Sequence, residues 1–161
     1  MKAIRVLLVG AAAGYVAGQV MDKATTWFYE RQSDASKQRE QLLLPEGAPM
    51  ASAKKLAALA GAEPTDEQTA QLAATLHQSL GQLYGVAAAT LAGRGVNPVS
   101  AGLATSLGGF LLVDELANSL FFTPPPQAYP PESHLRGLVG HLTFGATTGL
   151  LLAVARGLRL L

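Results

Sequence analysis

At 161 residues, the chain has the length of one domain. Only 14% of its residues are charged, against roughly 25% in soluble domains, and 49% are hydrophobic. The formal net charge of +1 gives no field that attracts nucleic acid, so we expect no nucleic-acid partner. Cysteine is absent, which excludes disulfides, thiolate metal sites and cysteine nucleophiles.

The charges are unevenly distributed and leave four segments that are nearly free of them. These segments are residues 4–21, 72–92, 96–122 and 135–155. Each approaches or exceeds the ~20 residues that cross ~30 Å of hydrocarbon as a helix. We therefore predict an all-α fold, an integral membrane four-helix bundle that forms a single domain over residues 1–161. A soluble alanine-rich bundle is the alternative, but its helices should each carry a charged face at a 3.6-residue period, and these segments do not.

The first segment also has features of a secretory signal peptide. Lys2 and Arg5 precede a short apolar run that contains small residues suitable for cleavage. However, the segment continues without a break into Trp27, Phe28 and Tyr29, which are typical of an aromatic anchor at the membrane interface. We therefore predict that this helix is retained.

Residues 22–71 form a long outer loop that we expect to be partly helical. Residues 31–41 are polar and permit an extension of the first helix, and residues 44–49 contain a break. Over residues 51–62, Leu56 and Leu59 share one face of a predicted amphipathic helix at the membrane surface, with lysines on another face.

Two further signals mark the ends of the later helices. Thr65 and Gln68 have the spacing of a capping box, which predicts that the second membrane helix begins near Asp66, outside the bilayer. The proline-rich residues 123–131 predict a stiff, polyproline-like connector before the fourth helix.

Glycines recur at four-residue intervals in three of the predicted spans. In lipid, close backbone contact through small residues replaces the hydrophobic drive between helices. These glycines therefore predict helix packing. Either all of them pack within one bundle, or one strip faces outward and forms a homo-oligomer or docks into a membrane protein complex. The residues are Gly10, Gly14, Gly18, Gly81, Gly85, Gly145 and Gly149.

The short flanks of the four spans differ in charge. One side carries only basic residues, and the positive-inside rule places that side, with both termini, in the cytoplasm. These residues are Lys2, Arg5, Arg94, Arg156 and Arg159.

Polar residues within the spans form the candidate site. His77 lies in the second span, Asp114 and Glu115 in the third, and His141 in the fourth. Alternating helix directions bring all four to the outer half of the bilayer, together with Gln19, Asp22, Gln78, Gln82 and Asn118 near the same depth. Ionisable side chains inside a membrane are costly and are usually paired or functional.

The chemistry of this group stays open between several possibilities. A structural pair that fixes helix register, a proton or ion site, a divalent metal site and a bis-histidine haem all fit the residue types. Neither His77 nor His141 has a ligand spacing such as H-E-x-x-H, so the metal signal is weak, and the sequence leaves any cofactor unknown. Asp114 and Glu115 point about 100° apart on a helix, so we expect one of them to reach His141.

Several segments resemble a known family. They are Val113-Asp114-Glu115-Leu116-Ala117-Asn118, Thr123-Pro124-Pro125-Pro126, the stretch from His134 to Gly145, and Ala17-Gly18-Gln19-Val20-Met21-Asp22-Lys23. Together they are similar to the YagU-like family of bacterial inner-membrane proteins. The resemblance implies a small multi-pass protein of the bacterial inner membrane and supplies no substrate.

We therefore predict a non-enzymatic protein whose surroundings are the lipid bilayer, with an accessory, complex-associated or envelope-homeostasis role. The rival prediction is a small transporter that handles protons, ions or metal with the polar group. A membrane enzyme ranks third, since no Ser-His-Asp spacing, P-loop or dinucleotide motif occurs in the sequence.

Overall fold

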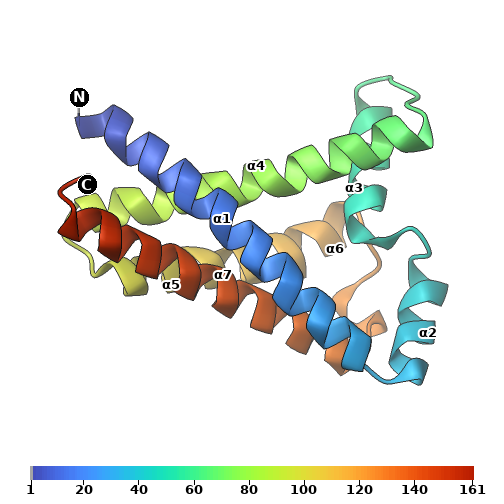
Figure 1. The fold of residues 1–161 in the computed structure, drawn as a ribbon. Helices are drawn as coiled ribbons and strands as arrows, with labels where there is room; N and C mark the ends of the chain where they lie inside the picture. The colour runs from blue at the N-terminus through green and yellow to red at the C-terminus, as the bar shows by residue number, and fades with distance from the viewer. Residues whose placement is uncertain (1) are drawn as a thin grey trace.

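The computed structural model describes residues 2–161, and all of their side chains except those of residues 2, 118 and 119. The predicted polar residue Asn118 therefore has a side chain outside the described part. Within residues 2–161 the chain is helical and contains no strand, which confirms the all-α prediction. The elements, drawn in Figure 1, are α1 (Lys2–Arg31), α2 (Asp34–Leu43), α3 (Gly47–Leu59), α4 (Asp66–Gly93), α5 (Pro98–Gly109), the π-helix η1 (Phe110–Ala117), α6 (Asn118–Phe121), the 3-10 turn η2 (Pro126–Ala128) and α7 (Pro131–Gly157).

Three stretches of helix among the described residues are long and apolar enough to cross a membrane. They are Ala3–Arg31, Pro98–Ala117 and Pro131–Gly157, which overlap the first, third and fourth predicted spans. The second predicted span lies in α4, which has 28 residues but is not among these three. Its glutamines and threonines lower its hydropathy, so length and composition identify three candidate spans rather than four.

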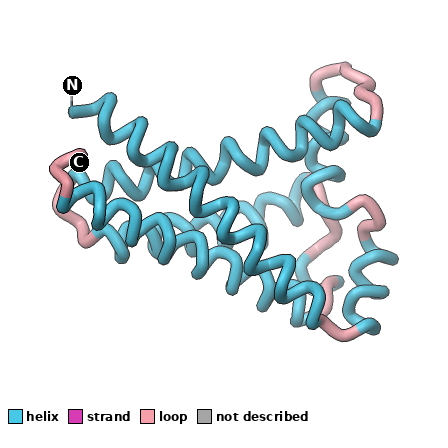
Figure 2. The backbone as a smooth tube through the Cα atoms, in the orientation of Figure 1, coloured by secondary structure: helices cyan, strands magenta, loops and turns pink. Residues whose placement is uncertain are grey.

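The long helices pack side by side and leave the chain ends together. α1 contacts α4 and α7, and α5 contacts α7 and α4. Figure 1 shows both termini at one end of the bundle, beside the turn between α4 and α5, whereas α2 and α3 lie at the opposite end. Figure 2 shows the loops gathered at these two ends. The core includes Ala13, Ala88, Ala89 and Leu152, and its small side chains let the helix axes approach closely.

Glycines make the contact between α1 and α4. A Cβ atom added at Gly10 would lie 2.7 Å from the Cα of Val86, and one added at Gly14 would overlap the carbonyl of Gly81. A Cβ at Gly85 would overlap the carbonyl of Gly10. Two backbones touch here, and only glycine leaves the space for them.

A second glycine contact joins α5 to α7. A Cβ at Gly145 would lie 2.9 Å from the Cα of Leu103, and one at Gly149 would lie 2.9 Å from the carbonyl oxygen of Pro98. The partner glycine on α5, Gly102, was not part of the predicted set, because it stands alone without a four-residue repeat. A Cβ added at Gly18 would meet nothing within 4 Å, so Gly18 makes no close helix contact within this chain.

The outer segment departs from the prediction at its start. Ser33 accepts a hydrogen bond from the backbone N–H of Ser36 and starts α2 as a separate helix, so α1 ends at Arg31 and does not extend through residues 31–41. α3 is a helix as predicted and packs on α4, with Ala51, Ala53 and Ala57 buried and Leu59 81% exposed. Its placement at a membrane surface stays a prediction.

The predicted helix ends are better matched. The Thr65–Gln68 capping box is present, and α4 begins at Asp66 as expected. The backbone is extended at Pro125 and Tyr129, but a 3-10 turn lies between them, so the proline-rich connector is polyproline-like only at its edges. The predicted third span, residues 96–122, is divided into α5, η1 and α6, with Asn97 as the N-cap of α5.

We expect Gly14→Leu to lower the melting temperature of the purified protein strongly, because its side chain would collide with the backbone of α4 and force α1 away. Gly18→Leu is the matched control on the same helix and should change the melting temperature little. Equal melting curves for the two variants would show that the Gly14 contact does not stabilise the bundle.

Candidate functional site

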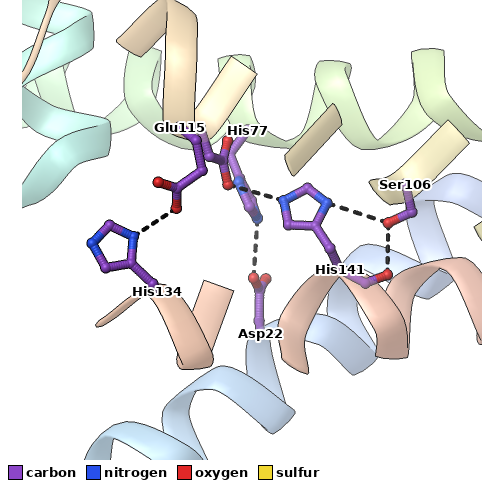
Figure 3. A network of polar contacts seen from close by, with 7 residues as sticks. Asp22, His77, Ser106, Glu115, His134 and His141 are labelled. Carbon is purple, nitrogen blue, oxygen red and sulfur yellow. Dashed lines mark hydrogen bonds and ion pairs between the residues drawn. The ribbon is translucent and has the colours of Figure 1, made fainter. Parts of the chain in front are cut away.

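The chain has three histidines, and each of them contacts a carboxylate of another helix (Figure 3). The distances are 3.0 Å from His77 Nε2 to Asp22 Oδ1, 2.8 Å from His134 Nδ1 to Glu115 Oε1, and 2.9 Å from His141 Nε2 to Asp114 Oδ2. The carboxylates belong to α1 and η1 and the imidazoles to α4 and α7, so each pair also joins two helices.

The predicted group of four residues is thus divided among three pairs. Asp114 reaches His141, which confirms that one of the two adjacent acids faces this histidine. Glu115 turns to His134 and His77 turns to Asp22, so these two residues do not join the His141 pair. The sequence missed His134 because the fourth span was predicted to start at residue 135, whereas α7 begins at Pro131.

His141 has a second hydrogen-bond partner, Ser106, which no sequence signal singled out. The Ser106 side chain is fully buried, and its hydroxyl donates a 2.6 Å hydrogen bond to the backbone carbonyl of His141. The same oxygen lies 3.2 Å from His141 Nδ1. A serine hydroxyl has one hydrogen, and here the carbonyl accepts it. We infer that Nδ1 of His141 then carries a hydrogen and donates it to the serine oxygen.

The inferred hydrogen on Nδ1 determines how the other ring nitrogen of His141 can interact with Asp114. A neutral imidazole that is protonated at Nδ1 has only a lone pair at Nε2, which would face the carboxylate of Asp114. The 2.9 Å contact is favourable only when a further proton lies between the two atoms. The Asp114–His141 pair therefore shares one proton beyond those of a neutral imidazole and a carboxylate.

The Glu115–His134 pair leads to the same result by a separate route. His134 Nε2 lies 3.0 Å from the backbone carbonyl oxygen of Pro126, which can only accept, so Nε2 carries a hydrogen. Nδ1 then faces Glu115, and the 2.8 Å contact again needs a shared proton. His77 differs, because Asp22 is its described partner and a neutral tautomer can donate to that carboxylate without an extra proton.

Ser106, His141 and Asp114 have the residue types of a hydrolase triad. A triad serine, however, must present its oxygen to a substrate and give its hydrogen to the histidine. Ser106 has no exposed surface, and its hydrogen is directed to a carbonyl. This arrangement orients the imidazole and does not present a nucleophile. No sequence signal indicated this arrangement of Ser106, His141 and Asp114, because such arrangements are recognised by their geometry and not by their spacing along the chain.

Two adjoining cavities bring the pairs into contact with solvent-accessible space. The inner cavity, about 80 Å³, lies between α1, α4, η1 and α7, and Gly18, Asp22 and His141 are among its lining residues. The open space at Gly18 therefore belongs to this cavity. The outer cavity, about 920 Å³, extends to α2, α3 and the start of α7. His77, Leu80 and Asp114 line both cavities and form the boundary between them.

A half-buried ion pair lies at the wall of the outer cavity. Arg136 donates to both carboxylate oxygens of Glu40, at 2.8 and 3.1 Å, and also to Gln32 at 2.8 Å. Ser133 donates to Glu40 at 2.6 Å. Burial raises the pKa of Glu40, but the hydrogen bonds from Arg136, Ser133 and Gln32 and the charge of Arg136 outweigh it, and the net pKa lies below the usual value. These contacts anchor α2 to α1 and α7.

The described side chains contain no group of three or more histidines and carboxylates that is arranged to hold a metal ion. Of the chemistries that the sequence left open, the geometry favours structural pairing and proton handling.

Comparisons with protein-family models, with curated proteins and with solved structures each return no match. The resemblance to the YagU-like family therefore stays a prediction.

We expect Glu40→Gln to lower the free energy of unfolding by about 2 kcal/mol at neutral pH, since Arg136 would lose a charged partner. Because folding lowers the pKa of Glu40, the ion pair stabilises the fold fully above the usual glutamate pKa of about 4.3 and less as the pH falls through the lowered value. Chemical denaturation in detergent across this range should show a steeper loss in the wild type than in the variant.

The control for this measurement is Glu132→Gln. Glu132 accepts a hydrogen bond from Ser33 at the exposed surface, so this change should have little effect. Parallel stability curves for the wild type and Glu40→Gln would contradict the importance of the half-buried pair.

Proposed function

We propose that this chain is a non-enzymatic, multi-pass protein of the bacterial inner membrane that binds and exchanges protons at its histidine–carboxylate pairs. The observation that carries the proposal is the position of Asp114, which shares a proton with His141 and lies at the boundary of two cavities. Ionisable groups inside membrane proteins face a water-filled cavity or one another, and such groups commonly relay protons. Asp114 and His141 meet both conditions.

We further propose that α4 is the fourth span, as the sequence analysis predicted. α4 packs glycine against glycine on α1, and a short turn joins it to α5, a candidate span. With α4 included, the chain crosses the bundle in alternating directions and returns its C-terminus to the end of the N-terminus (Figure 1). Two polar residues of α4, His77 and Gln78, then line the inner cavity beside α1.

The charges at that end support cytoplasmic termini. Arg5 and Arg94 lie near the N-terminus and the α4–α5 turn, and Arg156 donates hydrogen bonds to the carbonyls of Ala92 and Val96 in that turn. The opposite end carries the mixed charges of α2 and α3. Under the positive-inside rule, the cavities then open to the outer side of the membrane.

The two functions that the sequence left in competition make different demands on the site. An accessory protein that only docks into a complex has no need of shared protons beside a cavity, whereas a proton-handling protein needs both. We therefore favour proton exchange as the chemistry of this membrane protein. An accessory role in a membrane complex or homo-oligomer is compatible with it.

Acid–base titration of the protein in lipid nanodiscs tests the proposal. We expect His141→Asn to take up one proton fewer than the wild type over the titration, because an amide does not bind a proton whereas an imidazole does. Gln78→Asn, which also changes a side chain at the inner cavity, should leave the curve unchanged. A folded His141→Asn protein with the wild-type titration curve would show that this pair exchanges no proton.

The orientation is tested separately with single cysteines in the cysteine-free chain. Asp34 and Gln127 are exposed at the end that we place outside, and Arg94 is exposed at the other end. We expect an impermeant thiol reagent to label Asp34→Cys and Gln127→Cys in intact cells and Arg94→Cys only after lysis. The reverse pattern would invert the topology.

A further inference from the structure

The outer cavity has the size and lining of a small-molecule site. Its volume of about 920 Å³ falls within the about 300–1,000 Å³ that is usual for ligand pockets. Much of its lining is apolar, so it can surround the hydrocarbon part of a ligand. These residues include Leu44, Leu56, Leu76, Leu80, Phe110 and Phe122.

The basic side chains of this lining give it little attraction for an anion. Arg136 is the one lysine or arginine among the residues that line the cavity, and Glu40 neutralises it through two hydrogen bonds. The guanidinium of Arg136 also lies over the ring of Tyr29, at 5.1 Å from its centroid. His77, the next base on the wall, faces Asp22.

The acidic side chains behave differently. Glu46 lies 3.7 Å from Lys54, a permanently charged partner. Asp114 is instead balanced by the proton that it shares with His141, and its side chain is 43% exposed. When that proton leaves, the pair becomes a neutral imidazole beside a carboxylate, and one negative charge faces the cavity. Glu115 adds a second carboxylate to the cavity lining, beside His134.

We propose that the outer cavity binds a small organic cation with an apolar body, and that this cation replaces the proton shared by Asp114 and His141. The inference rests on the proposed proton exchange and names the ligand class of the same site. Charge is conserved in the exchange, since one positive charge enters the site and one proton leaves it for solvent. No covalent bond forms.

The lining favours an organic cation over a metal ion. A metal ion needs several oxygen or nitrogen ligands, and the described residues do not assemble three of the usual acidic or histidine ligands anywhere. An organic cation needs one carboxylate for its charge and apolar or aromatic surface for its body, and it is also attracted to aromatic faces. Asp114 supplies the charge, and Phe110 and Phe122 supply aromatic surface.

The test uses tetraphenylphosphonium, a cation that has no titratable proton, with the full-length protein in lipid nanodiscs. Isothermal titration calorimetry in two buffers of different ionisation enthalpy measures both the affinity and the number of protons released. We expect saturable binding with release of one proton, and a dissociation constant that rises up to about tenfold per unit of pH decrease. Asp114→Asn should weaken binding at least about tenfold, the scale of one lost charge interaction, and should abolish proton release.

Glu132→Gln is the matched control, because Glu132 lies on α7 outside the cavity lining, and it should bind like the wild type. Thermal melts of both variants establish that they are folded. The proposal would be overturned if the uncharged triphenylphosphine oxide bound as tightly as tetraphenylphosphonium and Asp114→Asn bound both compounds like the wild type. The cavity would then be an apolar pocket only. Absence of tetraphenylphosphonium binding would overturn the proposal too. If tetraphenylphosphonium does not bind but His141→Asn still takes up one proton fewer than the wild type, the proposed proton exchange stands without a cation ligand.

Discussion

The bundle depends on two helix contacts at which backbone meets backbone. Gly10 and Gly14 bring α1 against Gly81 and Gly85 of α4, and a second set of glycines joins α5 to α7. In a membrane, such contacts gain stability from van der Waals packing that larger side chains would prevent. α1 and α4 cross near the end that holds the termini and diverge toward α2 and α3, as Figure 1 shows. The divergence makes room for the inner cavity and then for the wider outer one.

The polar pairs lie where this divergence begins. Asp22 follows Gly14 by eight residues, which is about 12 Å along a helix, and there the axes are far enough apart for a carboxylate and an imidazole to fit between them. The α5–α7 contact has a related effect, because it holds Ser106 against His141 and thereby fixes which ring nitrogen carries a hydrogen. The close packing of α5 on α7 thus sets the hydrogen-bond partners of His141. The π-helix η1 contributes Asp114 and Glu115 on different faces, one toward each histidine of α7. Such segments are frequent at functional sites.

The sequence predicted those features that arise from local chemistry. Gaps between charges located α1, α5 and α7, and the Thr65–Gln68 box located the start of α4, since a capping box acts within one turn of helix. The contact between Asp114 and His141 was predicted from the similar depth that both residues were expected to have in the bilayer. Features that need three-dimensional context were missed. A lone glycine such as Gly102, a serine in an apolar helix such as Ser106 and a histidine before an apolar run such as His134 have no periodic signature. Gly18 continues the repeat of Gly10 and Gly14 but makes no close contact within the chain, because it borders the inner cavity.

We infer that His141 carries a hydrogen on Nδ1 and shares a second proton with Asp114. Nitrogen-15 NMR of histidine-labelled protein in lipid tests this most directly, because the two ring nitrogens report their protonation separately and the chain has only three histidines to assign. We expect Nδ1 of His141 to be protonated and Nε2 to give the signal of a nitrogen that shares a proton with an acceptor. A His141 signal with unprotonated Nδ1 and an ordinary N–H at Nε2 would contradict this inference.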